Sequence, residues 1–172
     1  AEPSGFVSDY LAIAVAELAS IAERRIDLLD RRVNPNLNMF LATEPGLESG
    51  FMMAHVTAAA LVSENKTLAH PASVDSLPTS AGQEDHVSMA PWAGRKLLAI
   101  CANTARVLGI ELLAAAQAVD AMRPLDTTPE LQRVHSLVRE HVPLRSHDHR
   151  LDRDIETLAT LVRSGAWSQF IG

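Results

Sequence analysis

The stretch "MAPWAGRKLLAICANTARVLGIELLAAAQAVDAM", Met89–Met122, decides the fold class of this chain. It reads as a single helix, which we expect to begin near Gln83 or Glu84 and to end at about Met122. Such a helix is far longer than the protein average of about 11–12 residues. Because a helix that is apolar on most sides is surrounded by other helices, the stretch predicts a bundle of long helices.

Four more helices are predicted on either side of this stretch. Two mostly apolar helices precede it, and two shorter helices follow it. Thr128 before Pro129 is a typical helix start, and Gly165 is a typical helix end. No segment shows the alternating pattern of a β-strand, so we expect an all-α protein. The four helices span about residues 6–32, 48–64, 129–142 and 152–164.

Composition excludes several classes of partner. Apolar residues make up 47% and aromatic residues 4% of the 172 residues, which favours packed helices. The net charge of −6 and the lack of a basic cluster argue against nucleic-acid binding. The longest apolar runs contain polar residues and fall short of the roughly 20 residues that a membrane span needs. We therefore expect no nucleic acid and no membrane among the partners.

The single cysteine, Cys101, cannot form an internal disulfide. Since it lies in an apolar run, we interpret it as a small buried side chain. The first residues contain no basic segment of a signal peptide. Both features fit a cytoplasmic protein.

The apolar surface of the predicted helices exceeds what the chain can cover. Three helices that are apolar on most faces would leave an exposed patch far above the few hundred Å² that are normal for a monomer. We infer that the chain packs against other chains in an oligomer. Along the chain we separate a helical-bundle portion, residues 1–123, from a region of shorter helices, residues 124–172.

Glu84, Asp85 and His86 form the first candidate site. Acidic residues in the first turn of a helix complement its positive end, which would explain them structurally. Alternatively, one carboxylate projects into a pocket built by the preceding loop and holds a cationic or N–H-bearing ligand. The residues alone leave both interpretations open.

The segment "HDHR", His147–Arg150, is the second candidate. It is compatible with a metal site, but adjacent ligands without further Cys or His at helical spacing are weak evidence. A solvated loop is the simpler interpretation, and the sequence requires no metal. Met52 is interpreted from its pattern alone as a core residue.

Three segments resemble a known family. They are "YLAIAVAELASIAERR" (Tyr10–Arg25), "SGFMMAHVTAAALVSENKTLAHPASVDSLPTSAGQEDHVSMA" (Ser49–Ala90) and "NTARVLGIELLAAAQAVD" (Asn103–Asp120). They are similar to the aromatic amino-acid lyases and, within that family, to the histidine ammonia-lyases. The resemblance covers most of the chain and weakens after about Arg123.

The resemblance implies a fold, a reaction and a site. The family is mostly helical and forms homotetramers whose active sites draw on several subunits. Histidine ammonia-lyases convert L-histidine to urocanate and ammonia with a methylidene-imidazolone (MIO) group, which forms from an Ala-Ser-Gly triplet. Their Gln-Glu-Asp-His motif places Glu84 against the substrate imidazole and Gln83 in the same wall, and Met52 matches a pocket-lining position. Gly82 departs from the family, which often has Asn there.

The resemblance covers only the later part of the sequences of this family. The Ser-Gly pairs follow Pro3, Glu48 and Arg163, so no Ala-Ser-Gly occurs, and we do not assign the single tyrosine, Tyr10, as the catalytic base. We therefore expect a C-terminal fragment that holds substrate-binding residues but no catalytic residue and that is inactive alone.

Two alternatives remain for the function. The chain could belong to a phenylalanine or tyrosine ammonia-lyase or aminomutase, although those enzymes resemble the motif with glutamine in place of Glu84. It could also be a helical oligomerisation module without catalysis.

Overall fold

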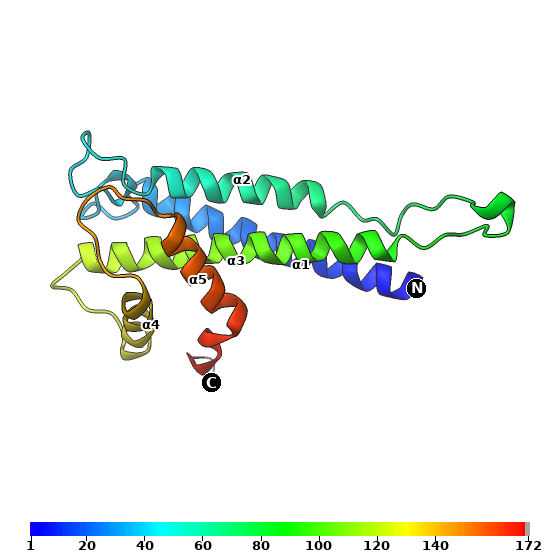
Figure 1. Ribbon diagram of the computed structural model, residues 1–172. Helices are drawn as coiled ribbons and strands as arrows, with labels where there is room; N and C mark the ends of the chain where they lie inside the picture. The colour runs from blue at the N-terminus through cyan, green and yellow to red at the C-terminus, as the bar shows by residue number, and fades with distance from the viewer. Residues whose placement is uncertain (171–172) are drawn as a thin grey trace. The chain divides into compact units, whose positions relative to one another are not determined.

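The computed structural model describes residues 1–170, which form five α-helices and no β-strand (Figure 1). The expected all-α fold class is confirmed. The predicted bounds of the last helix, the cap at Thr128 and the helix end at Gly165 also agree with the structure, in which Gly165 is left-handed. The helices are α1 (Glu2–Asp30), α2 (Met52–Leu68), α3 (Ala90–Ala121), α4 (Pro129–His141) and α5 (Asp152–Ser164), with short 3-10 helices η1 (Met39–Leu41), η2 (Ser80–Gly82) and η3 (Ala166–Phe170).

The start of α3 corrects the sequence prediction. The helix begins at Ala90, and Glu84 lies in the preceding loop. Pro91 explains the difference, because a proline is tolerated in the first turn of a helix but not in its interior, so a helix that contains Pro91 has to begin just before it. The Ser88 hydroxyl accepts a hydrogen bond from the Ala90 N–H at 3.2 Å and completes this start. The residues Glu84, Asp85 and His86 therefore do not lie in the first helical turn.

The start of α2 also lies later than predicted, at Met52 instead of near Glu48. Gly50 has a positive φ of 55°, and a Cβ at this position would collide with the carbonyl oxygen of Phe40. Such a conformation is not helical and is available mainly to glycine. The chain therefore completes a tight turn before α2 begins.

The chain divides into two compact units, residues 1–20 with 61–104 and residues 21–60 with the chain from 105 onward. In the first unit Ala12 and Ala16 of α1 pack against Ile100 of α3. Alanine has a short side chain, so it allows helices to approach closely. Val15, Leu68, Ala69 and Leu97 pack around this core.

A buried polar group joins α2 to α3 in the first unit. The Asn103 amide donates to the side-chain oxygen of Asn65 at 3.1 Å, and the Asn65 amide donates to the Thr104 hydroxyl at 3.3 Å. Asn65 is fully buried. Since buried amides without partners are costly, these bonds determine the register of the two helices.

In the second unit α5 packs closely on α3 at Gly109. A Cβ on Gly109 would lie 3.1 Å from both the Ala159 nitrogen and the Ile155 carbonyl oxygen. The missing side chain therefore allows the two backbones to approach. The core of this unit contains Ile26, Val107, Ile110, Val138, Val142 and Leu158. The predicted boundary at Arg123 lies in this unit, just after α3, and stays a prediction.

Apolar side chains remain exposed along the first part of α1. Tyr10 is 75% exposed and Val7 59% exposed. By length and composition alone α1 and α3 could also cross a membrane, but core helices of helical bundles pass the same test. Exposed large side chains in this part of α1 are Phe6, Val7, Tyr10, Leu11, Ile13 and Leu18.

The prediction that Cys101 is a small buried side chain was wrong, because its thiol is exposed. Cys101 follows the fully buried Ile100 on α3. Consecutive residues on a helix point about 100° apart. The apolar run therefore does not bury all of its members in this chain.

Candidate functional site

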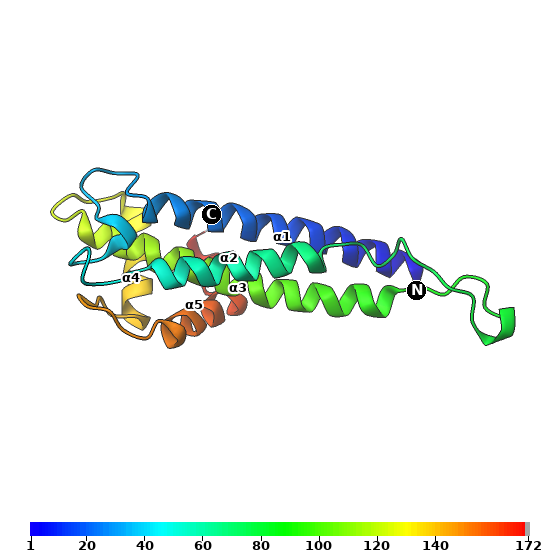
Figure 2. The same ribbon diagram turned by 90° about the horizontal axis from the view of Figure 1, so that it is seen from above.

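Gln83 and Glu84 lie on an arm, residues 73–89, that extends away from the ends of α2 and α3 (Figure 1, Figure 2). At its tip Ser80, Ala81 and Gly82 have φ values of 52°, 55° and 84°. Thr79 and Glu84 then exchange two backbone hydrogen bonds, with N–O distances of 2.9 and 3.3 Å. The tip is a closed turn, and Glu84 begins its returning limb.

A second link joins the two limbs closer to the helices. The Ser76 hydroxyl accepts a hydrogen bond from the Val87 N–H at 3.0 Å and lies 3.1 Å from the Val87 carbonyl oxygen, to which it donates. One side chain thus bonds to both polar backbone groups of Val87, the N–H and the C=O, on the opposite limb. Glu84, the backbone partner of Thr79, lies three residues before Val87 on the returning limb.

The base of the arm is tied to α1 and α3 by a buried ion pair. The Lys96 ammonium lies 3.3 Å from the Asp9 carboxylate, and each side chain is 4% exposed. Asp9 accepts the Ser73 N–H at 2.8 Å, and Lys96 donates to the His70 carbonyl. Burial acts to raise the pKa of Asp9, but the hydrogen bonds from Ser73, together with those from Ala72 and Lys96, bring it below its ordinary value. The carboxylate therefore stays charged and holds the first limb.

The side chains of Gln83 and Glu84 are exposed at the tip of this arm. Among residues 1–170 no hydrogen bond or ion pair reaches the Glu84 carboxylate. His86, also exposed, lies 3.8 Å from Glu2 on α1. A ligand or another chain segment can therefore reach Glu84 without breaking an existing bond.

Met52, the third predicted substrate-binding residue, is the first residue of α2 and belongs to the second unit. Its side chain is 36% exposed, so it is not a fully buried core residue. The structure brings Gln83 and Glu84 together on the arm. Their substrate-binding roles, and that of Met52, stay predictions.

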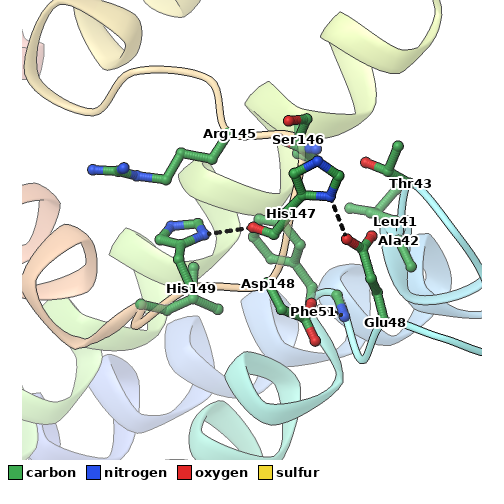
Figure 3. A pocket seen from close by; sticks show the side chains of 13 residues that line it. Leu41, Ala42, Thr43, Glu48, Phe51, Arg145, Ser146, His147, Asp148 and His149 are labelled. Atoms are coloured by element: carbon green, nitrogen blue, oxygen red, sulfur yellow. Dashed lines mark hydrogen bonds and ion pairs between the residues drawn. The ribbon is translucent and has the colours of Figure 1, made fainter.

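His147, Asp148 and His149 of the "HDHR" segment line the pocket in Figure 3, and the first two hold the segment before α2. Asp148 accepts the backbone N–H groups of Ser49 and Gly50 at 2.8 and 2.9 Å. The His147 imidazole donates to Glu48 at 2.8 Å. These bonds lower the pKa of Asp148 and of Glu48 below their ordinary values.

The geometry of this pocket favours a structural role. Its volume is about 40 Å³, whereas small-molecule sites commonly measure roughly 300–1,000 Å³. His149 pairs with Asp154 at 3.0 Å. The polar side-chain groups of His147, Asp148 and His149 thus have partners within the chain. In residues 1–170 no three His, Cys, Asp or Glu side chains are placed to hold a metal ion.

A second cluster of charges joins α1 to the first turns of α2. His55 Nε2 lies 2.9 Å from Glu23, and His55 Nδ1 lies 3.5 Å from Asp30. Hydrogen bonds from Arg24 and then from His55 lower the pKa of Glu23, although burial opposes them. Burial raises the pKa of Asp30 to about 6. Because His55 lies one turn after Met52, the cluster determines how this end of α2 is held.

Ser76 and Asp148 are the residues that the sequence patterns did not reveal. The partner of Ser76 lies 11 residues away along the chain, and the partners of Asp148 lie 98 and 99 residues away. No local spacing marks such pairs. A serine in the loop that precedes Glu84 was the only signal for Ser76.

The family model for aromatic amino acid lyases matches residues 1–140. The histidine ammonia-lyase of Burkholderia ambifaria is 56% identical over 169 residues, which cover 98% of this chain and 33% of that protein. The histidine ammonia-lyase of Aromatoleum aromaticum is 55% identical over 168 residues, with 98% of this chain and 32% of that protein covered. The chain thus spans about a third of the length of these curated relatives.

Solved structures agree with these relatives. The histidine ammonia-lyase of Trypanosoma cruzi superposes with a TM-score of 0.91 at 48% identity, covering 96% of this chain and 33% of that one. The tyrosine aminomutase of Streptomyces globisporus superposes with a TM-score of 0.93 at 36% identity, covering 99% and 33%. The sequence match and the shared fold together show that the chain belongs to the aromatic amino acid lyase family.

Proposed function

We propose that the chain forms part of a histidine ammonia-lyase, which removes ammonia from L-histidine to give urocanate. The observation that carries this proposal is Glu84, an exposed carboxylate on the returning limb of an anchored arm. The relatives named histidine ammonia-lyase at 55–56% identity support the same substrate.

The proposed role of Glu84 is to accept a hydrogen bond from an N–H group of the substrate imidazole. A hydrogen bond to an ionised group is roughly twice as strong as a neutral one. Gln83, next to Glu84, and Met52, at the start of α2, are the further proposed substrate-binding residues. The role requires that the backbone of Glu84 keeps one position, and the links across the arm hold this backbone.

The MIO group does not come from these residues. Ser4–Gly5 lies within α1, Ser49–Gly50 lies in the turn before α2, and Ser164–Gly165 ends α5. None of the three pairs follows an alanine. In this proposal other residues of the complete enzyme supply the group and the catalytic base, and the chain alone deaminates nothing.

The exposed apolar side chains of α1 support the further proposal of a homotetramer. Phe6, Val7 and Tyr10 are each more than half exposed. A second copy of the chain would remove this surface from water, which is the main driving force of association. We also propose a cytoplasmic location.

A hybrid lyase tests the function. In it, this chain replaces the matching third of the Burkholderia ambifaria enzyme, to which it is 56% identical. We expect the hybrid to form urocanate from L-histidine, followed by absorbance, and the 172-residue chain alone to form none. A hybrid that assembles like its parent but deaminates phenylalanine or tyrosine instead would support the alternative substrate class, and one that deaminates nothing would support the non-catalytic module.

The variant Glu84→Gln tests the proposed site in this hybrid. We expect a large rise in KM for histidine, because the imidazole loses its charged partner. Glu140→Gln is the matched control, since Glu140 is an exposed residue on α4. Histidine kinetics that are the same in both variants would contradict the role of Glu84.

A further inference from the structure

We propose that Ser76 is a positioning residue that holds Glu84 in place for substrate binding, an inference that rests on the proposed function. The hydroxyl of Ser76 closes the arm across its two limbs. Ser76 is not expected to touch the substrate. It acts through the backbone that carries Glu84.

Only a few contacts along the arm can position Glu84. At the base, Asp9 and Lys96 hold the first limb, which begins at Ser73. At the tip, Thr79 and Glu84 pair through their backbones. Between base and tip, Ser76 is the one residue in the described part of the chain whose side chain bonds to the backbone of the opposite limb.

Packing does not replace this link. Val74 is 72% exposed and Leu77 is 59% exposed, so the apolar residues of the first limb form no core within the chain. A two-stranded ribbon without a packed face is marginally stable on its own. Hydrogen bonds across the limbs therefore determine the shape of the arm, and the Val87 backbone has both of its polar groups on Ser76.

Loss of the hydroxyl should loosen the returning limb. The N–H and C=O of Val87 would lose their partner and turn to water, and Glu84, on the same limb, would sample several positions. Binding of the imidazole would then require ordering of the limb, which weakens binding. Because Glu84 binds the substrate and does not transfer its proton in this proposal, the effect should fall on KM more than on kcat.

The test compares Ser76→Ala and Ser76→Thr in the hybrid lyase. We expect Ser76→Ala to raise KM for histidine about tenfold, the effect of losing roughly one net hydrogen bond. Ser76→Thr keeps the hydroxyl and should restore KM. Ser80→Ala is the matched control, since Ser80 lies exposed on the same arm and its hydroxyl has no bond to any of residues 1–170. If Ser76→Ala fails to assemble, Ser76→Cys, with its weaker S–H donor, takes its place with a smaller expected rise.

Two further measurements separate positioning from a general structural role. In hydrogen exchange of the hybrid, Ser76→Ala should speed the exchange of the Val87 amide, which donates to Ser76. In a double-mutant cycle, Ser76→Ala should have little further effect on KM once Glu84→Gln is present, since residues that act through one another are not additive.

The outcomes distinguish this proposal from the one on which it rests. If Glu84→Gln raises KM and Ser76→Ala does not, or if the two effects are additive, the role of Ser76 is wrong and that of Glu84 stands. If Glu84→Gln leaves KM unchanged, the role of Glu84 fails, and the role of Ser76 fails with it.

Discussion

The carboxylate of Asp30 lies 3.5 Å from Nδ1 of His55, and its side chain is 2% exposed. Neither of its oxygens accepts a hydrogen bond from residues 1–170. A buried carboxylate without hydrogen bonds is costly when it is charged. This cost is reflected in the pKa of Asp30, which burial raises to about 6.

The raised pKa predicts that Asp30→Asn stabilises the protein at high pH. Between about pH 4 and pH 6 the folded carboxyl holds more protons than an unfolded one, so stability falls as the pH rises through this window. Above pH 6 the cost is fully present, about 3 kcal/mol at most for a shift of about two units. The variant should therefore have a higher Tm than the parent at pH 8 and a similar Tm at pH 4.

The control for this prediction is Asp75→Asn, because Asp75 is exposed. It should not change the difference in Tm between pH 4 and pH 8. The gain from Asp30→Asn is reduced by the loss of the carboxylate contact with His55. A lower Tm of Asp30→Asn at pH 8 would show that this contact outweighs the cost of burial.

Asp148→Asn should loosen the start of α2. The carboxylate accepts two backbone N–H groups, at Ser49 and Gly50, and an amide offers only one oxygen. We expect faster hydrogen exchange of both amides and a lower Tm. Asp85→Asn, a change at an exposed aspartate on the arm, should change neither.

The pH dependence of this contact has the opposite sign to that of Asp30. The pKa of Asp148 lies below its ordinary value because the backbone N–H groups stabilise the charged form. Its contribution is thus complete above the ordinary aspartate pKa of about 3.9 and is lost as the pH falls through the lower folded value. Equal Tm differences between parent and Asp148→Asn at pH 7 and pH 2 would contradict this assignment.

Gly109→Ala should destabilise the contact of α3 with α5. The new Cβ would lie 3.1 Å from two backbone atoms of α5, which cannot move independently of their helix. Overpacking of this kind costs about 1–3 kcal/mol. Gly94→Ala is the matched control on the same helix, since a Cβ there meets nothing within 4 Å. It should raise the Tm slightly, because alanine favours helix over glycine by about 1 kcal/mol.

Gly82→Asn should preserve histidine binding, whereas Gly82→Val should weaken it. Gly82 has a φ of 84°, and asparagine adopts positive φ far more readily than a β-branched residue. A Cβ at this position meets no neighbour, so backbone conformation alone decides the outcome. KM values of the two hybrid variants test this, and a raised KM for the asparagine variant would contradict it.

Local sequence patterns were sufficient to predict a helix boundary where a clear start or stop signal marks it. Thr128 before Pro129 and the glycine at 165 mark helix ends through groups only a few residues apart. The start of α3 was misplaced because acidic residues at a helix start and acidic residues in a loop look alike in sequence. Pro91 pointed to the correct start, since a proline fits the first turn of a helix but not its interior.

The role of the arm could not be obtained in the same way. Glu84 was identified through its motif, but the motif does not indicate that the residue lies on a linked ribbon instead of a helix. The hydroxyl of Ser76 and the carboxylate of Asp148 act on backbone groups that are distant in sequence. Their contacts exist only once the chain has folded.

Sequence alone was therefore enough for the all-α class, the family and the candidate residues Gln83, Glu84 and Met52, because apolar periodicity and motifs are properties of short segments. Tertiary structure decided how Glu84 is presented, what the "HDHR" segment does and which buried charge is costly. Each of these depends on hydrogen bonds and burial between segments, and a linear pattern does not contain the distances that determine them.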